Sequence, residues 1–433
     1  MSINRSVLIR GAALVAIVLV AVGVRAIFVD RESLDYLAFL RPWYDHIDSH
    51  DGIFALRDRF ADYNYPYLYL LAALTYLHIP SLIGIKAISV IFDVVLAAFV
   101  HRIVAQRHPG FGAPTLAFAI VLFLPTVVAN SGWWGQADSI YSAFVVGGVY
   151  FLLRRRPWWA CAFIGIALAF KLQTVFILPL VAWLVLRRWI PWRSLLAIPA
   201  AMVVLDIPAL LVGAPVGAVV SVYTNQVGSY KSTTLGAANI YQLLPFTGDL
   251  DWLAYAGIGI TAIIGVAFLG WTLRARPDVT PRAIMVVATA SVLLVPYLLP
   301  AMHDRYFYPA EVLTLAAAFF LPLAYLAVPI LVQLAGIGVY RETLDGPMVR
   351  EITEFLTHHR GMRLGDHPGG HGDRPGGGAF GPHGFGKSEH YESGRGNGLL
   401  QTYAAMMAAA LLLHLGVTAW VVRRREPVPT VDS

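Results

Sequence analysis

Charged residues are scarce in this chain of 433 residues. Asp, Glu, Lys and Arg together make up 13% of it, whereas hydrophobic residues make up 58% and the mean hydropathy is +0.64. A soluble domain carries about 25% charged residues, so the composition excludes an ordinary soluble fold. Cysteine is scarcer still. With Cys161 as the single cysteine, no disulfide can form within the chain.

The few charges that are present do not form a nucleic-acid-binding pattern. The net charge is +6, and an anionic partner is one way to explain it. Basic clusters at the cytoplasmic ends of membrane helices explain it more simply. We therefore expect membrane lipids, and no nucleic acid, among the partners.

Apolar runs make up most of the chain. About 12 of them have the length and hydropathy expected of membrane helices or parts of such helices. Two adjacent pairs, 158–186 and 309–338, could each be one long kinked helix. Arg5 and Arg10 precede the first run, which is long for a signal peptide and predicts an uncleaved signal anchor. The runs lie near 6–28, 82–104, 114–130, 139–153, 158–170, 174–186, 194–212, 252–273, 282–299, 309–322, 324–338 and 400–422.

These runs predict an all-α fold, a polytopic transmembrane helix bundle. We expect a membrane-embedded core over 1–338 and an outer loop rich in glycine and histidine, largely disordered, over 339–399. A last span over 400–422 and a cytoplasmic tail over 423–433 complete the chain. The histidines of 357–390 do not have the spacing of a closed zinc site.

The positive-inside rule orients the bundle. With the N-terminus in the cytoplasm, every short basic cluster falls on the inner side of the cell membrane. The outer side then holds the long loops 29–80, 213–251 and 339–399 and the short turns 131–138, 171–173 and 300–308.

The first outer loop contains an amphipathic segment. Apolar residues recur at helical spacing from Leu34 to Ile47, with charged residues between them, which predicts an interfacial helix. Pro42 is expected to kink or split it. Asp35, at its start, could accept a proton from a hydroxyl group, or it could be a solvated charge favoured by the helix dipole.

Other polar motifs fall on the same predicted outer face. Lys171 interrupts an apolar stretch and must either reach the surface or meet an anion, for which a lipid phosphate is one candidate. Arg305 offers a planar fork for phosphate. His303 could donate to a leaving phosphate or ligate a metal. The remaining polar candidates on this face are Asn64, Tyr65, Trp134, Gln136, Asp138, Gln173, Asn239, Asp304 and Tyr306.

Three questions stay open at this level. Asp138 could cap the following helix instead of serving a site. Asp35, Asp138 and His303 could share a divalent cation such as Mg²⁺ or Mn²⁺, which spacing alone does not decide. Asp93 and Asp206 lie inside predicted spans without a charged partner evident in the sequence, and we interpret them as structural hydrogen-bonding groups.

The ordered motifs resemble those of the GT-C superfamily of polytopic membrane glycosyltransferases, nearest the bacterial mannosyltransferase-like members. The matching stretches are Leu34-Asp35-Tyr36, Tyr65-Pro66-Tyr67, Trp134-Gly135-Gln136-Ala137-Asp138, Ala169-Phe170-Lys171-Leu172-Gln173 and His303-Asp304-Arg305-Tyr306. The resemblance implies a catalytic base in the first outer loop, which falls on Asp35. It also implies a polyprenyl-phosphate sugar donor and inversion at the anomeric carbon.

The resulting hypothesis is inverting transfer of a hexose, with mannose favoured, to a lipid, glycan or protein acceptor on the outer side. Asp35 would be the base. Lys171, Arg305 and His303 would bind the donor phosphate, and the remaining polar candidates would form the sugar or acceptor pocket. One alternative is a transporter or flippase of a lipid-linked sugar. Another is a non-catalytic scaffold of the cell envelope.

Overall fold

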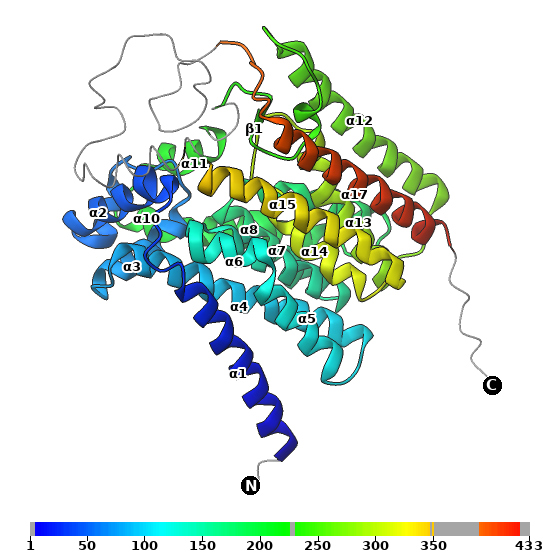
Figure 1. Cartoon of the computed structure of the whole chain (residues 1–433), viewed down its shortest axis with the longest axis horizontal. Coiled ribbons are helices and arrows are strands. Elements are labelled where there is room, and N and C mark those ends of the chain that lie inside the picture. Colours follow the sequence, from blue (N-terminus) through cyan, green and yellow to red (C-terminus); the bar gives the residue numbers. More distant parts are fainter. Residues whose placement is uncertain (1–4, 226–229, 347–348, 350–388, 425–433) are drawn as a thin grey trace.

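The computed structural model describes residues 5–225, 230–346, 349 and 389–424. Nearly all of its regular structure is helical (Figure 1). The first part of the chain forms one long helix followed by short helices of the segment 29–80, which is the first outer loop of the predicted topology. These are α1 (Arg5–Ala26), the π-helical turn η1 (Tyr36–Leu40), α2 (Arg41–Ser49), the 3-10 turn η2 (Gly52–Arg57) and α3 (Tyr65–Tyr76).

The middle of the chain supplies most of the packed bundle. Helix α7 packs against α4 and α8, and α10 packs against α8. The elements are α4 (Ser81–Arg107), α5 (Gly112–Phe123), α6 (Pro125–Val128), the π-helical turn η3 (Ala129–Trp134), α7 (Asp138–Leu153), α8 (Pro157–Phe170), η4 (Leu172–Ile177), α9 (Leu178–Leu186), η5 (Trp192–Leu196) and α10 (Ala197–Leu211).

The last part closes the bundle, with α17 packed on α13 and α15. A two-residue parallel strand pair joins β1 to β2, aligning Thr234 with Met302 and Leu235 with His303. The elements are α11 (Val216–Asn225), β1 (Thr234–Leu235), η6 (Ile240–Gln242), α12 (Asp251–Ala275), α13 (Pro281–Leu298), β2 (Met302–His303), α14 (Tyr308–Ala318), η7 (Leu323–Leu326), α15 (Ala327–Asp345) and α17 (Gly398–Arg423).

The described residues confirm a multi-pass, all-α membrane bundle. Each of the predicted apolar runs falls on a helix, and the two uncertain pairs are broken at Lys171 and at Pro322. By length and composition, 7 helices can cross a membrane, or 8 if α5 and the α6–η3 segment, bent by 49°, count as one span. Helices α7, α8 and α14 are shorter than the roughly 20 residues that a straight span needs.

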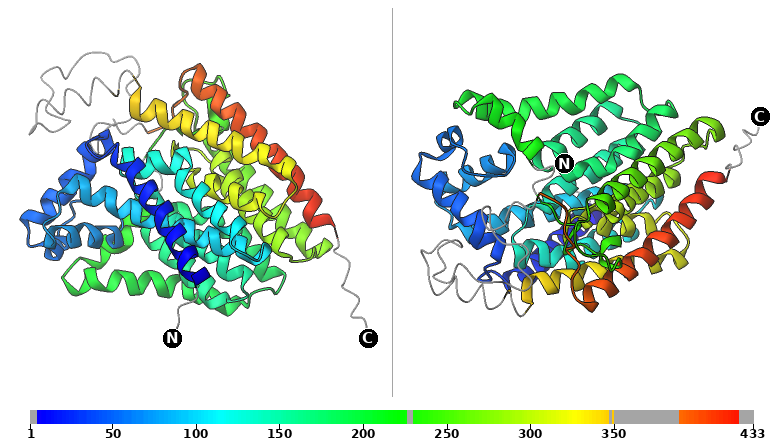
Figure 2. Two further views of the ribbon diagram at one scale, coloured as in Figure 1. Left: turned by 60° about the horizontal axis from the view of Figure 1, so that its bottom comes forward. Right: turned by 90° about the horizontal axis from the view of Figure 1, so that it is seen from above.

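The faces of the bundle differ in burial. Helices α1 and α12 are only 6% buried within their most apolar windows, whereas α13 is 67% buried. Figure 2 shows α1 running along one side of the bundle, and Figure 1 shows that α1 begins and α17 ends toward the same side. The exposed apolar faces of α1 and α12 are therefore available to lipid, while α13 belongs to the core.

A buried ion pair fixes α1 to the bundle. Arg25 lies 2.8 Å from Asp93 of α4 and donates to Ser131 of η3 at 2.9 Å. It also donates to the Leu122 carbonyl at 3.0 Å. The charged partner of Asp93 was not evident in the sequence because it lies 68 residues away, and these contacts agree with the interpretation of Asp93 as a structural hydrogen-bonding group. The pair satisfies both buried charges and anchors η3, the turn that leads to Trp134.

The helix predicted over Leu34 to Ile47 is present, as η1 followed by α2. Leu34, Leu40 and Ile47 are buried, and Leu37 is half-buried. Pro42 does not end the helix, because it lies in the first turn of α2, where its missing N–H costs no helical hydrogen bond. The π-helical turn η1 directly precedes it and continues into α2.

Candidate active site

Four segments that are distant in sequence meet beside the first outer loop. Asp35 precedes η1, Asp138 begins α7, Lys171 occupies the break between α8 and η4, and Arg305 lies between β2 and α14. Ion pairs connect all four side chains into one network. The predicted meeting of Asp35, Lys171 and Arg305 is therefore present in the structure.

Asp35 makes all of its side-chain contacts with the described residues through one carboxylate oxygen. Its Oδ2 accepts from Trp134 Nε1 at 3.1 Å and from Gln136 Nε2, and it lies 3.2 Å from Arg305 Nη1. The side chain is 19% exposed. Oδ2 thus anchors the carboxylate, and Oδ1 is left available to a reactant.

Local hydrogen bonds place Asp35 against the tryptophan motif. Ser33 donates its hydroxyl to the Trp134 carbonyl at 2.8 Å, and the Tyr36 N–H donates to the Ser33 hydroxyl at 3.1 Å. Lys86 of α4 donates to the carbonyls of Phe28 and Arg31, both at 2.6 Å. These bonds hold the turn after α1, so that Asp35 enters η1 at a fixed position.

Gly135 forms the turn that lets Trp134 and Gln136 both donate hydrogen bonds to Asp35. It ends η3 with φ 74°, in the left-handed region that glycine adopts without steric cost. The chain reverses there, so that Trp134 before it and Gln136 after it both contact the same carboxylate oxygen. Single π-helical turns such as η3 and η1 are frequent at functional sites.

Asp138 is the buried centre of the network. Its Oδ1 pairs with Lys171, and its Oδ2 accepts from Asn130 at 2.9 Å and lies 3.7 Å from Arg305 Nε. Asp138 is the first residue of α7, whose N-cap is Ala137, and among the described residues its carboxylate accepts from Asn130 and Lys171. The capping alternative is therefore not observed, and the anion that buried Lys171 meets is a carboxylate of the same chain.

Arg305 bridges the carboxylates. It contacts Asp35 and Asp138, lies 3.5 Å from Asp304 Oδ1, and its guanidinium is 5.3 Å from the ring centroid of Trp134. Burial lowers the pKa of Arg305, but the three carboxylates together raise it above its usual value. The group stays cationic, and its Nε makes no hydrogen bond with the described residues.

The strand pair positions the segment that carries Arg305. The Asp304 N–H donates to the Leu235 carbonyl at 3.1 Å, and Ala301, at φ 57°, makes a left-handed turn just before β2. Asp304 also accepts from Thr343 of α15 at 2.9 Å. Burial and nearby Asp35 raise the pKa of Asp304 to about 6, although Arg305 lowers it.

Two aromatic residues and an amide adjoin this segment. The His303 ring lies 5.0 Å from Tyr230 and 5.2 Å from Tyr306. Burial raises the pKa of Tyr306, and Gln173 near its hydroxyl lowers it. Burial, together with the charges of Arg305 and Lys171, lowers the pKa of His303 well below its ordinary value. His303 is therefore neutral and can donate a hydrogen bond from one ring nitrogen only.

Three predicted site residues have their described contacts elsewhere. Asn64 lies near the Tyr223 hydroxyl, and Tyr65 lies within electrostatic reach of Arg59 and Asp206. Asn239 is fully buried at the start of η6, and its amide group makes no hydrogen bond within the described part of the chain. The structure does not bring these three into the network around Arg305.

The network also includes residues that the sequence did not point to. Thr343 and Asn130 belong to it through hydrogen bonds to Asp304 and Asp138. Tyr63 belongs to it because its buried hydroxyl lies near Asp138. Burial raises the pKa of Tyr63, and Asp138 raises it further. Asn130 interrupts an apolar run, which is a usable sequence signal. Thr343 is a single hydroxyl near a helix end and gives none.

A shared divalent cation does not fit the donor set of Asp35, Asp138 and His303. The guanidinium of Arg305 stands between the two carboxylates and is their common counter-ion. Among the described residues, donors close enough together to hold a metal occur in two other groups, His46 with His50 and Asp58, and Asp249 with Asp251 and His390. We therefore route no chemical step at this site through a metal.

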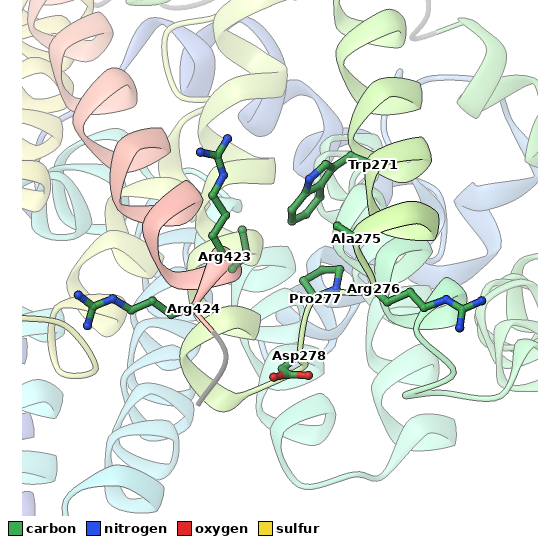
Figure 3. A pocket seen from close by; sticks show the side chains of 8 residues that line it. Trp271, Ala275, Arg276, Pro277, Asp278, Arg423 and Arg424 are labelled. Atoms are coloured by element: carbon green, nitrogen blue, oxygen red, sulfur yellow. The ribbon is translucent and has the colours of Figure 1, made fainter. Parts of the chain in front are cut away.

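A surface pocket of about 230 Å³ lies apart from the network, between the ends of α12 and α17 (Figure 3). Its lining includes Trp271, Asp278 and Arg423, and the Arg276 and Arg424 side chains point away to either side. These are helix ends predicted to face the cytoplasm. None of the predicted site residues lines this pocket.

The fold and site are those of a multi-pass membrane protein with a half-buried acidic and cationic centre at its first outer loop. Residues 63–296 match the model of glycosyltransferase family 87. This match spans more than half of the chain, so the protein belongs to glycosyltransferase family 87 and is a glycosyltransferase. The assignment agrees with the membrane glycosyltransferase resemblance of the sequence motifs.

The chain was also compared with curated proteins and with solved structures. No curated protein matches the chain. Among solved structures, the chain is similar to the crystal structure of ArnT from Cupriavidus metallidurans bound to undecaprenyl phosphate, with 14% sequence identity and a TM-score of 0.49. The alignment covers 94% of this chain and 76% of that one.

Proposed function

We propose that this glycosyltransferase transfers a hexose, with mannose favoured, from a polyprenyl-phosphate donor to an acceptor hydroxyl on the outer side of the membrane. The acceptor is a lipid, a glycan or a protein. The observation that carries the proposal is the arrangement of Asp35, with Oδ2 held by three donors and Oδ1 left open. A base in glycosyl transfer needs one such free oxygen.

The reaction forms one bond and breaks one. The acceptor oxygen attacks the anomeric carbon as its proton passes to Asp35 Oδ1, and the bond from that carbon to the phosphate oxygen breaks. The electron pair leaves with the phosphate, giving polyprenyl phosphate and an inverted glycosidic linkage. General base catalysis of this kind contributes about 10² to 10⁴ in rate.

Arg305 is the first candidate for binding the phosphate. Its side chain is 17% exposed, and its Nη1 lies 3.2 Å from Asp35 Oδ2. Lys171 is the second positive charge near this position, and it forms a buried ion pair with Asp138. We assign His303, which is neutral and lies two residues before Arg305, as a hydrogen-bond donor to the same group.

The sugar or acceptor pocket is assigned to the residues around this charged centre. Trp134 offers a ring face beside Arg305, and Gln136 and Asp304 contact the network directly. Gln173 and Tyr306 form its other edge. Asn64, Tyr65 and Asn239 are left out of the contact set because their described surroundings lie elsewhere.

A lipid-linked donor suits the placement of the site. The charged centre lies at the junction of the membrane bundle and the interfacial helix, and apolar helix faces are exposed around the bundle. An amphiphilic donor can therefore keep its chain in lipid while its phosphate reaches Arg305. A nucleotide sugar is water-soluble and has no lipid chain to place against these apolar helix faces.

The family assignment sets aside the transporter and scaffold alternatives. A transporter would be expected to use charged groups near the middle of the membrane for its substrate. The two charged candidates inside the predicted spans are Asp93 and Asp206, and Asp93 instead forms an ion pair with Arg25.

The test uses the full-length protein purified and reconstituted in liposomes. Radiolabelled polyprenyl-phosphate mannose, polyprenyl-phosphate glucose and GDP-mannose are offered separately with an envelope glycolipid extract as acceptor. We expect label to move only from a polyprenyl-phosphate donor, with release of polyprenyl phosphate and an inverted product. Transfer from GDP-mannose alone, or retention of configuration, would contradict the proposal.

A further inference from the structure

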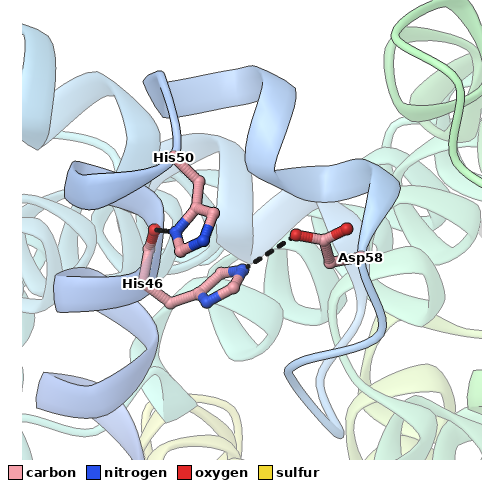
Figure 4. Close-up of side chains that lie close together, drawn as sticks. All are labelled: His46, His50 and Asp58. Atoms are coloured by element: carbon pink, nitrogen blue, oxygen red, sulfur yellow. Dashed lines mark hydrogen bonds and ion pairs between the residues drawn. The ribbon is translucent and has the colours of Figure 1, made fainter.

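A second group of polar side chains lies on the first outer loop, apart from the network around Arg305. His46 and His50 are one turn apart on α2 and at its end, and Asp58 follows η2 (Figure 4). One donor atom of each residue lies within 4.8 Å of the other two. Histidines four residues apart on a helix face the same side, which is a common metal-binding spacing.

The hydrogen bonds of His50 determine which of its ring nitrogens is free. Its Nδ1 lies 2.9 Å from the His46 carbonyl oxygen and 3.0 Å from the Ser49 hydroxyl. That hydroxyl already donates to the Asp45 carbonyl at 2.7 Å, and a carbonyl only accepts. The hydrogen must therefore be on Nδ1 of His50, and its Nε2 carries a lone pair.

This is the arrangement that prepares a histidine for metal binding. Metal-ligating histidines commonly donate one ring N–H to a carbonyl, which fixes the tautomer and turns the other nitrogen toward the ion. The carbonyl of His46 fills this role for His50.

His46 presents its own nitrogen to the same place. Its ring is held between those of His50 at 4.0 Å and Phe60 at 4.2 Å. Its Nε2 lies 3.3 Å from Asp58 Oδ2, yet this buried nitrogen makes no hydrogen bond with the described residues (Figure 4).

We propose that His46, His50 and Asp58 bind a divalent transition-metal ion of the zinc class. Two imidazole nitrogens and one carboxylate oxygen suit zinc, whereas Mg²⁺ and Ca²⁺ prefer oxygen ligands throughout. Zinc bonds of about 2.0–2.2 Å require the donors to move closer together than they now lie. The exposed Asp58 and His50 side chains are able to rotate, and water completes the coordination from the open side.

The ion acts as a structural clamp. It joins α2 to the segment after η2, which passes through Phe60 toward Tyr63 of the charged network. His46 is 11 residues beyond Asp35 along nearly continuous helix, or about 16 Å at 1.5 Å per residue. The metal therefore takes no direct part in chemistry at Asp35.

The other group of possible metal donors differs in its hydrogen bonding. His390 Nδ1 hydrogen-bonds Asp251 at 2.8 Å, and that bond raises the pKa of His390. This nitrogen is therefore engaged by a carboxylate, whereas Nε2 of His46 makes no hydrogen bond with the described residues. His390→Ala serves as a matched control.

The test compares zinc binding by full-length variants without an affinity tag. Protein in detergent is stripped with chelator, equilibrated with micromolar ZnCl₂, desalted and measured for zinc by mass spectrometry. We expect the wild type and His390→Ala to hold one zinc ion more than His46→Ala. His50→Gln, a change at an exposed position that keeps the fold, should bind zinc at least about tenfold more weakly than wild type.

A second readout does not depend on total zinc, since 13 histidines are present in the chain. Zinc should slow amide hydrogen exchange over residues 46–60 in the wild type and not in His50→Gln. Equal zinc content in wild type and His50→Gln, or exchange that zinc leaves unchanged, would overturn the proposal.

Discussion

Asp35 and Asp138 are carboxylates in one network, but their surroundings give them different capacities. Both oxygens of Asp138 are occupied, one by Lys171 and the other by Asn130 and Arg305, and the side chain is fully buried. Asp35 is partly exposed and is held by Oδ2 alone. A proton from a substrate can therefore reach Asp35, whereas Asp138 serves to organise the cations.

If Arg305 binds the donor phosphate as proposed, Asp304 should make donor binding depend on pH. Its pKa of about 6 means that above pH 6 it is ionised and competes with the donor phosphate for Arg305. Below pH 6 it is neutral and leaves Arg305 to the phosphate. We expect the KM for the donor to rise between pH 5 and pH 7 in the wild type and to stay low and flat in Asp304→Asn.

Stability provides the control for Asp304. A carboxyl group whose pKa is raised on folding stabilises the protein at low pH, and this contribution is lost as pH rises from about 4 to about 6. The thermal midpoint of Asp304→Asn should lack this decline. A wild-type KM that is independent of pH would contradict the assigned competition for Arg305.

Removing Lys171 should destabilise the protein. Lys171→Met leaves Asp138 buried beside only Arg305 and Asn130, and breaking a buried pair in this way costs about 3–5 kcal/mol. We expect a lower thermal midpoint in detergent, recovered in part by the double variant Lys171→Met with Asp138→Asn.

The double variant also separates two roles of Lys171. If Lys171 contributes charge to the donor phosphate, the stable double variant keeps a raised donor KM. A donor KM equal to that of wild type would restrict Lys171 to holding Asp138.

At the scale of elements, the turn at Gly135 decides whether Trp134 and Gln136 reach the same oxygen of Asp35. Gly135→Ala places a Cβ in ordinary contact with Ile85 and Lys86, both at 3.6 Å, so space is not the difficulty. The difficulty is the left-handed φ of 74°, which costs an L-residue about 1–2 kcal/mol.

We therefore expect Gly135→Ala to lower kcat more than it lowers the thermal midpoint, because the two donors to Asp35 are displaced while the bundle remains. Gly112→Ala, at a helix start with open space around it, is the matched control. An unchanged kcat in Gly135→Ala would contradict the claim that this turn positions Trp134 and Gln136 for catalysis.

The helices and the site were predictable to different extents. Each apolar run falls on a helix, because hydropathy selects membrane helices, but only 7 or 8 of the described helices are long enough to span, against about 12 predicted. Positive charges in short loops placed Asp35, Lys171 and Arg305 on one face, and the three do meet. The pairing of Lys171 with Asp138 and of Arg25 with Asp93 depends on packing between distant segments, which spacing along the chain does not encode. The same holds for Thr343 against Asp304.

At the scale of the whole molecule, the bundle separates two faces. Thr247 lies in the loop that ends at α12, and Gln106 lies at the end of α4, and both are exposed. We propose that the first faces outward and the second faces the cytoplasm, as the basic clusters indicate.

Thiol labelling of intact cells checks this orientation. The native Cys161 is fully buried and should not react, so single substitutions can be read directly. A membrane-impermeant maleimide should label Thr247→Cys in intact cells and Gln106→Cys only after permeabilisation. Labelling in the opposite order would place the charged centre on the cytoplasmic side.

The most direct measurement is the turnover of Asp35→Asn with a polyprenyl-phosphate hexose donor. Asparagine keeps the size of the side chain and an oxygen for Trp134 and Gln136, but it cannot take a proton at neutral pH. We expect kcat to fall about 10² to 10⁴-fold, with donor binding retained, while Asp45→Asn, an exposed acid on the same helical segment, keeps wild-type turnover. Wild-type turnover by a folded Asp35→Asn protein would contradict the assignment of Asp35 as the base.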